Sequence, residues 1–285
     1  MNEISFMSIK RSRIMYIFEA ALEYFISILV AGSYLATLTK ELGFSDSLTG
    51  ILSSVISLGC LFQLFSLLVR RKKVKAFVLI FSIINQLLFM LLYIIPLTNF
   101  EKHTKIVIFV VLIFLAYLIY NFVHPKKINW LMSLIDDKQR GSFTANKEIV
   151  SLVSGMIFTF GMGAIIDYFS ETGRIRLAFV FSAIVIFALM VLHSLTMLFT
   201  VEKELPNCNK KNYKQTFIEL IKNKNIIKVT IIFILYYIST YISTPFYGIY
   251  QISELGLNLK FVSAAVMCGS VSRILISKFW GRYAD

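Results

Sequence analysis

Repeated runs of about 20 apolar residues, rich in Phe, Ile and Leu, constrain this chain more than any other feature. A helix of that length rises about 30 Å, the thickness of the hydrocarbon core of a bilayer. Of the 285 residues, 57% are hydrophobic and only 16% are charged, too few to give a soluble domain a polar surface. Strands are disfavoured, because no alternating ten-residue pattern recurs and lipid cannot satisfy an open sheet edge. The sequence therefore predicts an all-α, polytopic transmembrane helix bundle.

Eight segments are long enough to cross a bilayer. The first is too long for the core of a signal peptide and has no small-residue cleavage site after it, so we predict a retained span. The fourth and seventh contain polar interruptions. The predicted spans are about 14–39, 47–69, 76–97, 105–125 with an extension to 135 as the alternative, 148–169, 177–201, 226–250 and 258–280.

Basic residues predict the orientation of these spans. The formal net charge is +13, and most of the 29 Lys and Arg residues lie in short clusters in the loops of one side. Such a bias marks the cytoplasmic side of membrane proteins and argues against nucleic-acid binding. We therefore expect a multi-pass protein of the cell membrane with a cytoplasmic N-terminus. The Ile, Lys and Asn bias indicates a bacterial source.

A central loop and a short repeat predict the domain organisation. The loop 202–225 is Lys-rich and follows the sixth span, and the tripeptide Glu-Leu-Gly occurs at 41–43 and again at 254–256. Both copies join two spans at the outer side, as expected for parallel halves of six spans. The stretch 216–228 is a candidate amphipathic surface helix, and a disordered linker is an equal alternative for 202–214.

The predicted domains follow from that repeat. They are a six-span N-terminal bundle at 1–201, a cytoplasmic central linker at 202–225, and the first two spans of an incomplete C-terminal bundle at 226–285. Since Asp285 stands where a ninth span should begin, we expect a truncated product that lacks about four spans.

Short loop motifs resemble those of the major facilitator superfamily. The end of the chain, Gly-Arg-Tyr-Ala-Asp at 281–285, is similar to the family's Gly-x-x-x-Asp loop signature between spans 8 and 9. The matching loop at 69–73 keeps the basic residues and lacks the Gly and Asp, and 130–141 is similar to the Asp…Arg-Gly pattern after span four. The resemblance implies a secondary transporter that works by alternating access. It marks as gating-loop candidates Arg70, Arg71, Asp136, Arg140, Gly281 and Asp285.

Two carboxylates in the first span are candidates for substrate or ion binding. Glu19 and Glu23 are four residues apart, so they share one helix face, and Glu23 lies about 15 Å of helix beyond Arg13, near the bilayer midplane. Adjacent carboxylates repel when both are ionised, so at least one should keep its proton. This favours a proton-coupling site or a cation ligand. The alternative is a structural ion pair with Arg273 or with a lysine of another span.

Polar groups in the fourth span form a second set. Asn121 and His124 precede Pro125, which frees a backbone carbonyl and can kink a helix. They are candidates for binding, with interhelical hydrogen bonds as the alternative. Lys126 and Lys127 are predicted to snorkel to the inner interface, with an anion site facing the cavity as the alternative.

The seventh and eighth spans supply the remaining candidates. Tyr237, Tyr241 and Thr244 belong to a stretch too polar to face lipid, and the family resemblance places spans 1, 4 and 7 around a central cavity. Their side chains would hydrogen-bond a polar solute, and interhelical packing is the alternative. Arg273 is a candidate for an anionic substrate or a carboxylate partner, and snorkelling competes.

Further polar and small residues are interpreted structurally. We predict interhelical hydrogen bonds for Gln63, Asn85 and Gln86. Three glycines of the fifth span are predicted close-packing positions, namely Gly155, Gly161 and Gly163.

These features favour a secondary active transporter of a small solute, with protons as the candidate coupling ion. The alternatives are a non-transporting fragment or membrane scaffold and, with less support, a membrane-embedded enzyme. No Gly-rich phosphate loop occurs, and His103, His124 and His193 are scattered along the chain. We therefore expect no enzyme activity, no cofactor and no metal, and partners limited to a small-molecule substrate, protons and the lipid bilayer.

Overall fold

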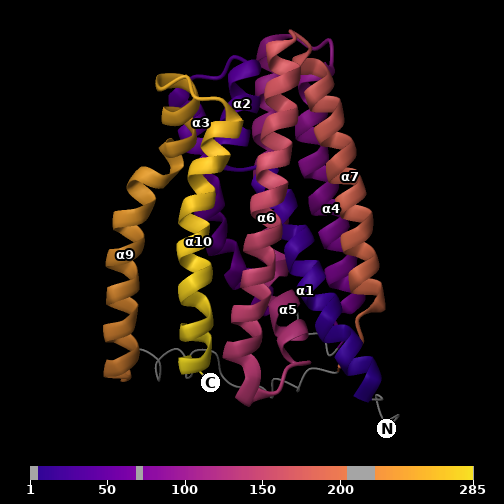
Figure 1. Cartoon of the computed structure of the whole chain (residues 1–285), viewed down its shortest axis with the longest axis vertical. Coiled ribbons are helices and arrows are strands. Elements are labelled where there is room, and N and C mark those ends of the chain that lie inside the picture. Colours follow the sequence, from indigo (N-terminus) through magenta and orange to yellow (C-terminus); the bar gives the residue numbers. More distant parts are fainter. Residues whose placement is uncertain (1–5, 69–72, 204–221, 285) are drawn as a thin grey trace.

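The computed structural model describes residues 6–68, 73–203 and 222–284, and within these ranges the chain is helical and contains no strand. The helices run back and forth along one long axis (Figure 1). The prediction of an all-α polytopic bundle is therefore confirmed.

Seven helical stretches of the described ranges are long and apolar enough to cross a membrane. In each one, fewer than half of the residues in the most apolar window are buried, so the other apolar side chains point outward. Such a surface suits lipid rather than water. The helices are α1 (Phe6–Leu29) continued by α2 (Gly32–Glu41), α4 (Lys75–Ile94), α5 (Lys102–Met132), α6 (Arg140–Glu171), α7 (Ile175–Phe199), α9 (Lys224–Ile249) and α10 (Leu259–Ala284).

The first predicted span is broken between α1 and α2. Gly32 has a φ of +53°, a left-handed conformation that ends the regular helix. The break frees backbone carbonyls, and two tyrosine hydroxyls satisfy them: Tyr93 donates to the carbonyl of Leu29 at 2.5 Å, and Tyr117 to that of Val30 at 3.0 Å. The helix therefore bends without leaving these polar groups unpaired in the core.

The second predicted span changes helix type halfway. Its first half is α3 (Asp46–Leu58), and its second half is a 3₁₀ helix, η1 (Gly59–Leu68). At the change, a Cβ added to Gly59 would lie 2.3 Å from Nδ2 of Asn121, so η1 packs closely against α5. The predicted pass is therefore helical, although it is not one of the seven long helices.

The bundle has two ends, which we name by their helices. The proximal end holds the start of α1 and the end of α10, and the distal end holds α2 and the turn between α9 and α10 (Figure 1). Helices α6 and α10 lie side by side along their length, and α9 contacts α2 and α3. Residues 224–239 of α9 are all exposed, so α9 packs against the bundle mainly near the distal end.

Most of the predicted linker and the start of the predicted amphipathic helix fall at 204–221, outside the described residues. Helix α9 begins at Lys224, where the side chain of Asn223 accepts hydrogen bonds from the N–H groups of Asn225 and Ile226.

At the distal end, Asp167 of α6 caps the N-terminus of α10. Its carboxylate accepts the N–H groups of Leu259 at 3.0 Å and Lys260 at 2.7 Å. We predict that Asp167→Ala lowers the free energy of unfolding by about 1 kcal/mol, because two helix-end donors lose their acceptor. Thermal unfolding in detergent would measure the loss. Glu171→Ala, on the exposed end of the same helix, is the matched control, and an equal effect of both variants would contradict the capping role.

Candidate functional site

A cavity of about 320 Å³, which we call the charged cavity, lies among α1, α5, α6 and α10. Its volume suits a small solute. Three carboxylates and three cations line it, together with aromatic side chains and one histidine. These residues are Glu19, Glu23, Glu148, Lys127, Lys147, Arg273, Tyr16, Tyr24, Tyr120 and His124.

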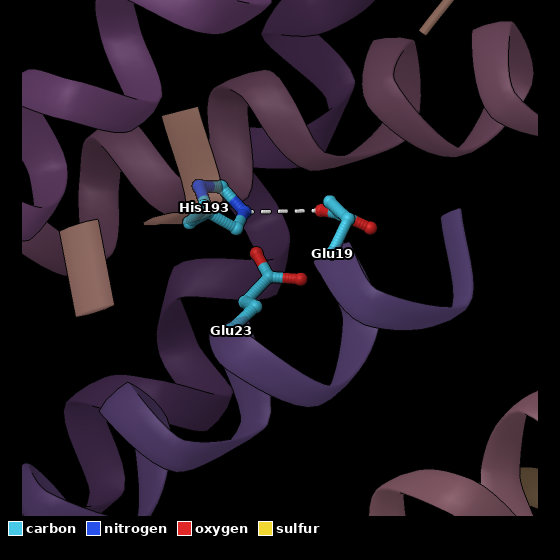
Figure 2. Close-up of side chains that lie close together, drawn as sticks. All are labelled: Glu19, Glu23 and His193. Atoms are coloured by element: carbon cyan, nitrogen blue, oxygen red, sulfur yellow. Dashed lines mark hydrogen bonds and ion pairs between the residues drawn. The ribbon is translucent and has the colours of Figure 1, made fainter. Parts of the chain in front are cut away.

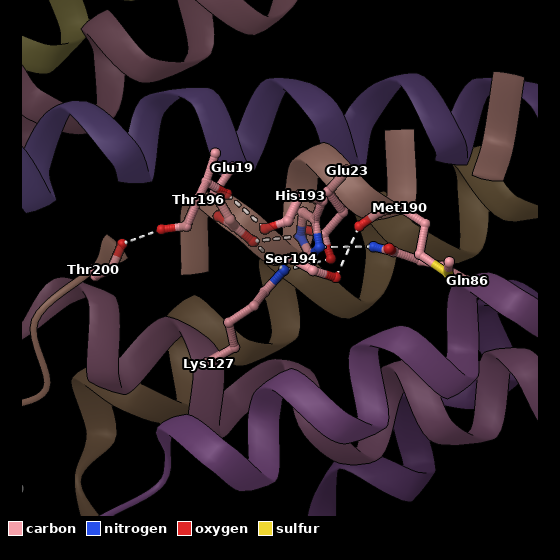
Figure 3. Close-up of polar contacts among 9 residues, drawn as sticks. All are labelled: Glu19, Glu23, Gln86, Lys127, Met190, His193, Ser194, Thr196 and Thr200. Carbon is pink, nitrogen blue, oxygen red and sulfur yellow. Dashed lines mark hydrogen bonds and ion pairs between the residues drawn. The ribbon is translucent and has the colours of Figure 1, made fainter. Parts of the chain in front are cut away.

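At the centre of the charge arrangement, one lysine is shared by two carboxylates. The α-helical spacing of Glu19 and Glu23 places them on one face of α1, and Lys127 of α5 reaches both (Figure 3). Its Nζ lies 2.8 Å from Oε1 of Glu19 and also forms an ion pair with Glu23. The Lys127 side chain is 3% exposed, and a charge so deeply buried is tolerated only when it is paired.

His193 of α7 and Gln86 of α4 extend this ion-paired group. The Nε2 atom of His193 lies 3.2 Å from Oε1 of Glu19, and its Nδ1 atom lies 3.0 Å from Nε2 of Gln86. An amide nitrogen can only donate, so Nδ1 accepts, and a neutral ring then carries its proton on Nε2 and donates to Glu19. One oxygen of Glu19 therefore receives two donors, from α5 and α7.

The same side chains also resemble a ligand set for a cation. One ligand atom from each of Glu19, Glu23 and His193 lies within 4.8 Å of the others, as their converging side chains in Figure 2 illustrate. The Lys127 ammonium already contacts both carboxylates and supplies positive charge at this point. A proton or a metal ion that binds here would therefore compete with Lys127 for the carboxylates.

A second ion pair crosses from α6 to α10. Arg273 pairs with Glu148, and both side chains are partly exposed, at 64% and 39%. The pair lines the charged cavity and also a second cavity of about 700 Å³, whose lining includes Arg140, Trp280 and Gly281. It thus lies where the two cavities adjoin.

Four of the predicted binding residues meet at the charged cavity: Glu19, Glu23, His124 and Arg273. The two carboxylates pair with a lysine of another span, which was one of the alternatives for them. The prediction that Lys127 snorkels to the interface is wrong, because Lys127 is buried between these carboxylates.

Asn121 lies elsewhere, between α5 and η1. Its side-chain oxygen accepts from Nε2 of Gln63 at 3.1 Å, and its amide nitrogen donates to the carbonyl of Tyr117 at 2.9 Å. The predicted interhelical hydrogen bonds of Gln63 and Gln86 are present, and Asn85 donates to the carbonyl of Ala116 at 2.7 Å. Asn121 is therefore held by structural contacts rather than by the charged cavity.

The structure does not bring the α9 candidates to the charged cavity. Tyr237 and Thr244 are exposed, and Thr244 donates to the carbonyl of Thr240 at 2.7 Å. The side chain of Tyr241 lies outside the described part of the chain. This placement follows from the distal packing of α9, and a role of these residues in solute binding stays a prediction.

The described gating-loop candidates lie at the proximal end. Asp136 accepts from Arg13 at 2.9 Å, and Arg140 pairs with Asp137 at 2.8 Å. A Cβ added to Gly281 would lie 2.4 Å from Cβ of Ala145, so the glycine permits close contact between α10 and α6. The other three candidates, Arg70, Arg71 and Asp285, lie outside the described residues.

Three glycines of α6 were predicted to allow close packing, and two of them lie in close contact with neighbouring helices. A Cβ added to Gly155 would lie 2.3 Å from the ring of Tyr24, and one added to Gly163 would lie 3.1 Å from the backbone of Leu259. No heavy atom of the described chain lies within 4 Å of a Cβ added to Gly161, so that prediction is wrong.

Sequence reasoning missed Lys147, Glu148, His193 and Gln86 as members of the site. The predicted fifth span began at 148, so Lys147 was assigned to the loop before it and Glu148 to the first position of the span. Helix α6 begins at Arg140, which puts both residues two turns inside the helix. The position of His193 within an apolar run was the only sequence signal that α7 contacts Glu19 of α1.

Comparisons with known proteins match this chain to a family but to no individual protein. No curated protein and no solved structure matches the chain. The sequence profile of the Major Facilitator Superfamily matches residues 17–285, nearly the whole chain, including the helices that carry the charged cavity. The chain therefore belongs to the major facilitator superfamily of membrane transporters.

Proposed function

We propose that this protein is a secondary active transporter that moves a small solute by alternating access and couples this movement to protons. The observation that carries the proposal is the buried lysine shared by two carboxylates, Glu19 and Glu23, beside a cavity of solute size. Ionisable groups inside a membrane are costly, and they mark ion and substrate pathways.

The two carboxylates have different roles in this proposal. Glu19 is 2% exposed and holds contacts to both Lys127 and His193, so it anchors the lysine. Glu23 is 23% exposed and lines the charged cavity, where a proton can reach it. A proton on Glu23 would remove its charge and weaken its ion pair, which leaves Lys127 bound to Glu19 alone. The ion pairs then differ between protonated and unprotonated states, as coupling requires.

Alternating access needs two bodies that move against each other. We assign residues 1–201 to one body and the chain from 226 onward to the second, joined by the linker 202–225. The Arg273–Glu148 pair spans this boundary beside the charged cavity. The basic bias of the loops supports a cytoplasmic N-terminus, and the Ile, Lys and Asn bias of the chain supports a bacterial source.

A metal cation is the second candidate for the coupling ion. The favouring observation is the set of ligand atoms from Glu19, Glu23 and His193, all within 4.8 Å of one another. Imidazole with two carboxylates suits a divalent transition metal.

The coupling proposal predicts that Glu23→Gln abolishes pH-dependent transport. The full protein would be reconstituted in liposomes and offered a panel of sugars, peptides, drugs and organic anions under an inward proton gradient. Uptake by the wild type should fall when the gradient is collapsed, and uptake by Glu23→Gln should not respond to the gradient, because a side-chain amide does not gain or lose charge with pH.

Glu171→Gln, at the exposed end of α6, is the control and should behave as the wild type. Unchanged proton coupling in Glu23→Gln would contradict the assignment. Stimulation by a divalent metal gradient instead of a proton gradient would favour the metal alternative, and a wild type that moves no solute would favour the non-transporting scaffold.

A further inference from the structure

One cation of the charged cavity has no carboxylate of its own. Lys127 forms ion pairs with Glu19 and Glu23, and Arg273 forms an ion pair with Glu148. Lys147 of α6 remains, and within the described chain no carboxylate oxygen lies within 4.0 Å of its Nζ. Lys147 is half-buried, and its ammonium lies over the ring of Tyr16, 5.0 Å from the centroid. The ring holds the cation inside the cavity instead of letting it reach solvent.

Two polar atoms of residues that line the same cavity, one on α1 and one on α5, are also without a partner. Among the described residues, the hydroxyl of Tyr16 and the Nδ1 atom of His124 are buried and make no hydrogen bond. Tyr16 is 1% exposed, so water at the protein surface does not satisfy it. Buried polar atoms are nearly always hydrogen-bonded, and an exception calls for a cause. A bound solute in the cavity would supply the missing partner.

We propose that Lys147 and the Tyr16 hydroxyl bind the anionic group, a carboxylate or a phosphate, of the transported solute. An ammonium and a phenolic O–H are both donors, and charge-assisted hydrogen bonds to an anion are the strongest that they can form. His124 of α5 also lines the cavity and offers one more ring nitrogen to the solute. The volume of about 320 Å³ limits the solute to a small organic acid or phosphate ester.

The charges of the cavity link this subsite to the proton. Three carboxylates face three cations, so an anionic solute adds negative charge to a neutral lining. A proton on Glu23 would offset one such charge, which makes the solute and the proton favour each other's binding. This linkage rests on the proposed function, whereas the binding of the anion by Lys147 does not.

The test measures binding to the purified full-length protein at one fixed pH with no gradient. Thermal protection would be compared within matched pairs of compounds: benzoate and benzamide, succinate and succinamide, glycerol 3-phosphate and glycerol. At least one acid should protect the wild type, and its neutral counterpart should not. Lys147→Gln should weaken the apparent affinity for that acid about tenfold or more, and Lys147→Arg should keep much of it.

Tyr16→Phe separates a ligand role from a structural one. Since the hydroxyl of Tyr16 has no partner in the described chain, its removal should leave the melting temperature of the unliganded protein unchanged. The same variant should still bind the acid several-fold more weakly, roughly the effect of one lost hydrogen bond.

The matched control is Lys260→Gln. Lys260 also lies over an aromatic ring, 5.9 Å from the centroid of Phe160, but it does not line the charged cavity. It should bind the acid as the wild type does. Protection by none of the acids, equal protection by an acid and its neutral partner, or wild-type affinity in Lys147→Gln would each overturn the proposal.

The outcomes also separate the two proposals. Selective protection by benzoate or succinate identifies a carboxylate, and protection by glycerol 3-phosphate identifies a phosphate. An acid-binding protein whose uptake ignores the proton gradient would contradict the coupling and leave the anion subsite standing. Gradient-driven uptake of neutral solutes that Lys147→Gln does not affect would contradict the anion subsite and leave the proton coupling standing.

Discussion

Replacement of Lys127 by Met is expected to lower the free energy of unfolding by about 3–5 kcal/mol and to abolish transport. The variant keeps the length of the side chain but leaves Glu19, which is 2% exposed, and Glu23 without their shared cation. A buried carboxylate that loses its partner keeps its desolvation cost, and the two carboxylates repel each other across one helix turn. Thermal unfolding in detergent and the yield of monodisperse protein would measure the loss.

A set of variants shows whether the unpaired charge is the cause. Lys126→Gln changes the adjacent lysine and should alter stability by no more than about 0.5 kcal/mol. Adding Glu19→Gln and Glu23→Gln to Lys127→Met removes the orphaned carboxylates and should recover most of the stability. Gradient-driven uptake should stay absent in this triple variant, because the proposed proton site, Glu23, is now an amide. A single Lys127→Met variant as stable as the wild type would refute the buried ion-paired group.

The folding of the chain into membrane-length helices could be predicted from the sequence because lipid leaves the backbone few choices. A run of apolar residues in hydrocarbon must satisfy its N–H and C=O groups internally, so run length translates directly into helices. The breaks within the first two passes could not be predicted in this way. Glycine is compatible with a helix and with a break, and the deciding partners, the hydroxyls of Tyr93 and Tyr117 and the amide of Asn121, come from α4 and α5.

Charged residues at the ends of spans were the main source of error in the site. Hydropathy ends a span at the first charge, so the fourth span was predicted to end near 125 with an extension to 135 as the alternative, and Lys127 was left at the interface. Helix α5 continues to Met132, because Glu19 and Glu23 neutralise Lys127 inside the bundle. The spacing of the two carboxylates is local and was readable from the sequence. Their partner depends on how α1 packs against α5, which no local pattern encodes.

Contacts between distant segments explain in the same way why Tyr237 and Thr244 of α9 do not line the charged cavity. Hydropathy located this helix closely, because the span predicted at 226–250 is α9 at Lys224–Ile249, but composition does not say which neighbour the helix meets. In the structure, Ser33 of α2 donates to Gln251 of η4 (Tyr250–Glu254), the short π-helical turn after α9, at 2.9 Å. The distal end is thus joined by contacts between segments more than 200 residues apart.

Gly248→Ala is expected to push α9 away from α2 and to open the distal end. A Cβ at Gly248 would lie 2.6 Å from the backbone carbon and oxygen of Gly32 and 2.9 Å from the backbone nitrogen of Ser33. Backbone atoms cannot rotate aside as a side chain can, so the helices must separate. Overpacking of this kind costs about 1–3 kcal/mol, enough to shift an equilibrium between closed and open states by about tenfold or more.

Spin-label distances would measure the opening. With the native cysteines replaced by serine, labels at Lys40→Cys on α2 and Glu254→Cys on η4 would report the distal gap, since both positions are exposed. The distance distribution should move to longer values in Gly248→Ala, and the melting temperature should fall.

Alanine substitutions at two glycines of other helices are the controls for this test. No heavy atom of the described chain lies within 4 Å of a Cβ added to Gly161 or Gly269, so alanine at either position meets no neighbour. Alanine is also favoured over glycine inside a helix by up to about 1 kcal/mol, so these two controls should be neutral or slightly stabilised. Gly248→Ala gains the same helix preference, and a net loss therefore isolates the contact with α2. If Gly248→Ala has the same melting temperature as the two control variants and keeps the wild-type spin-label distances, the glycine contact does not close the distal end.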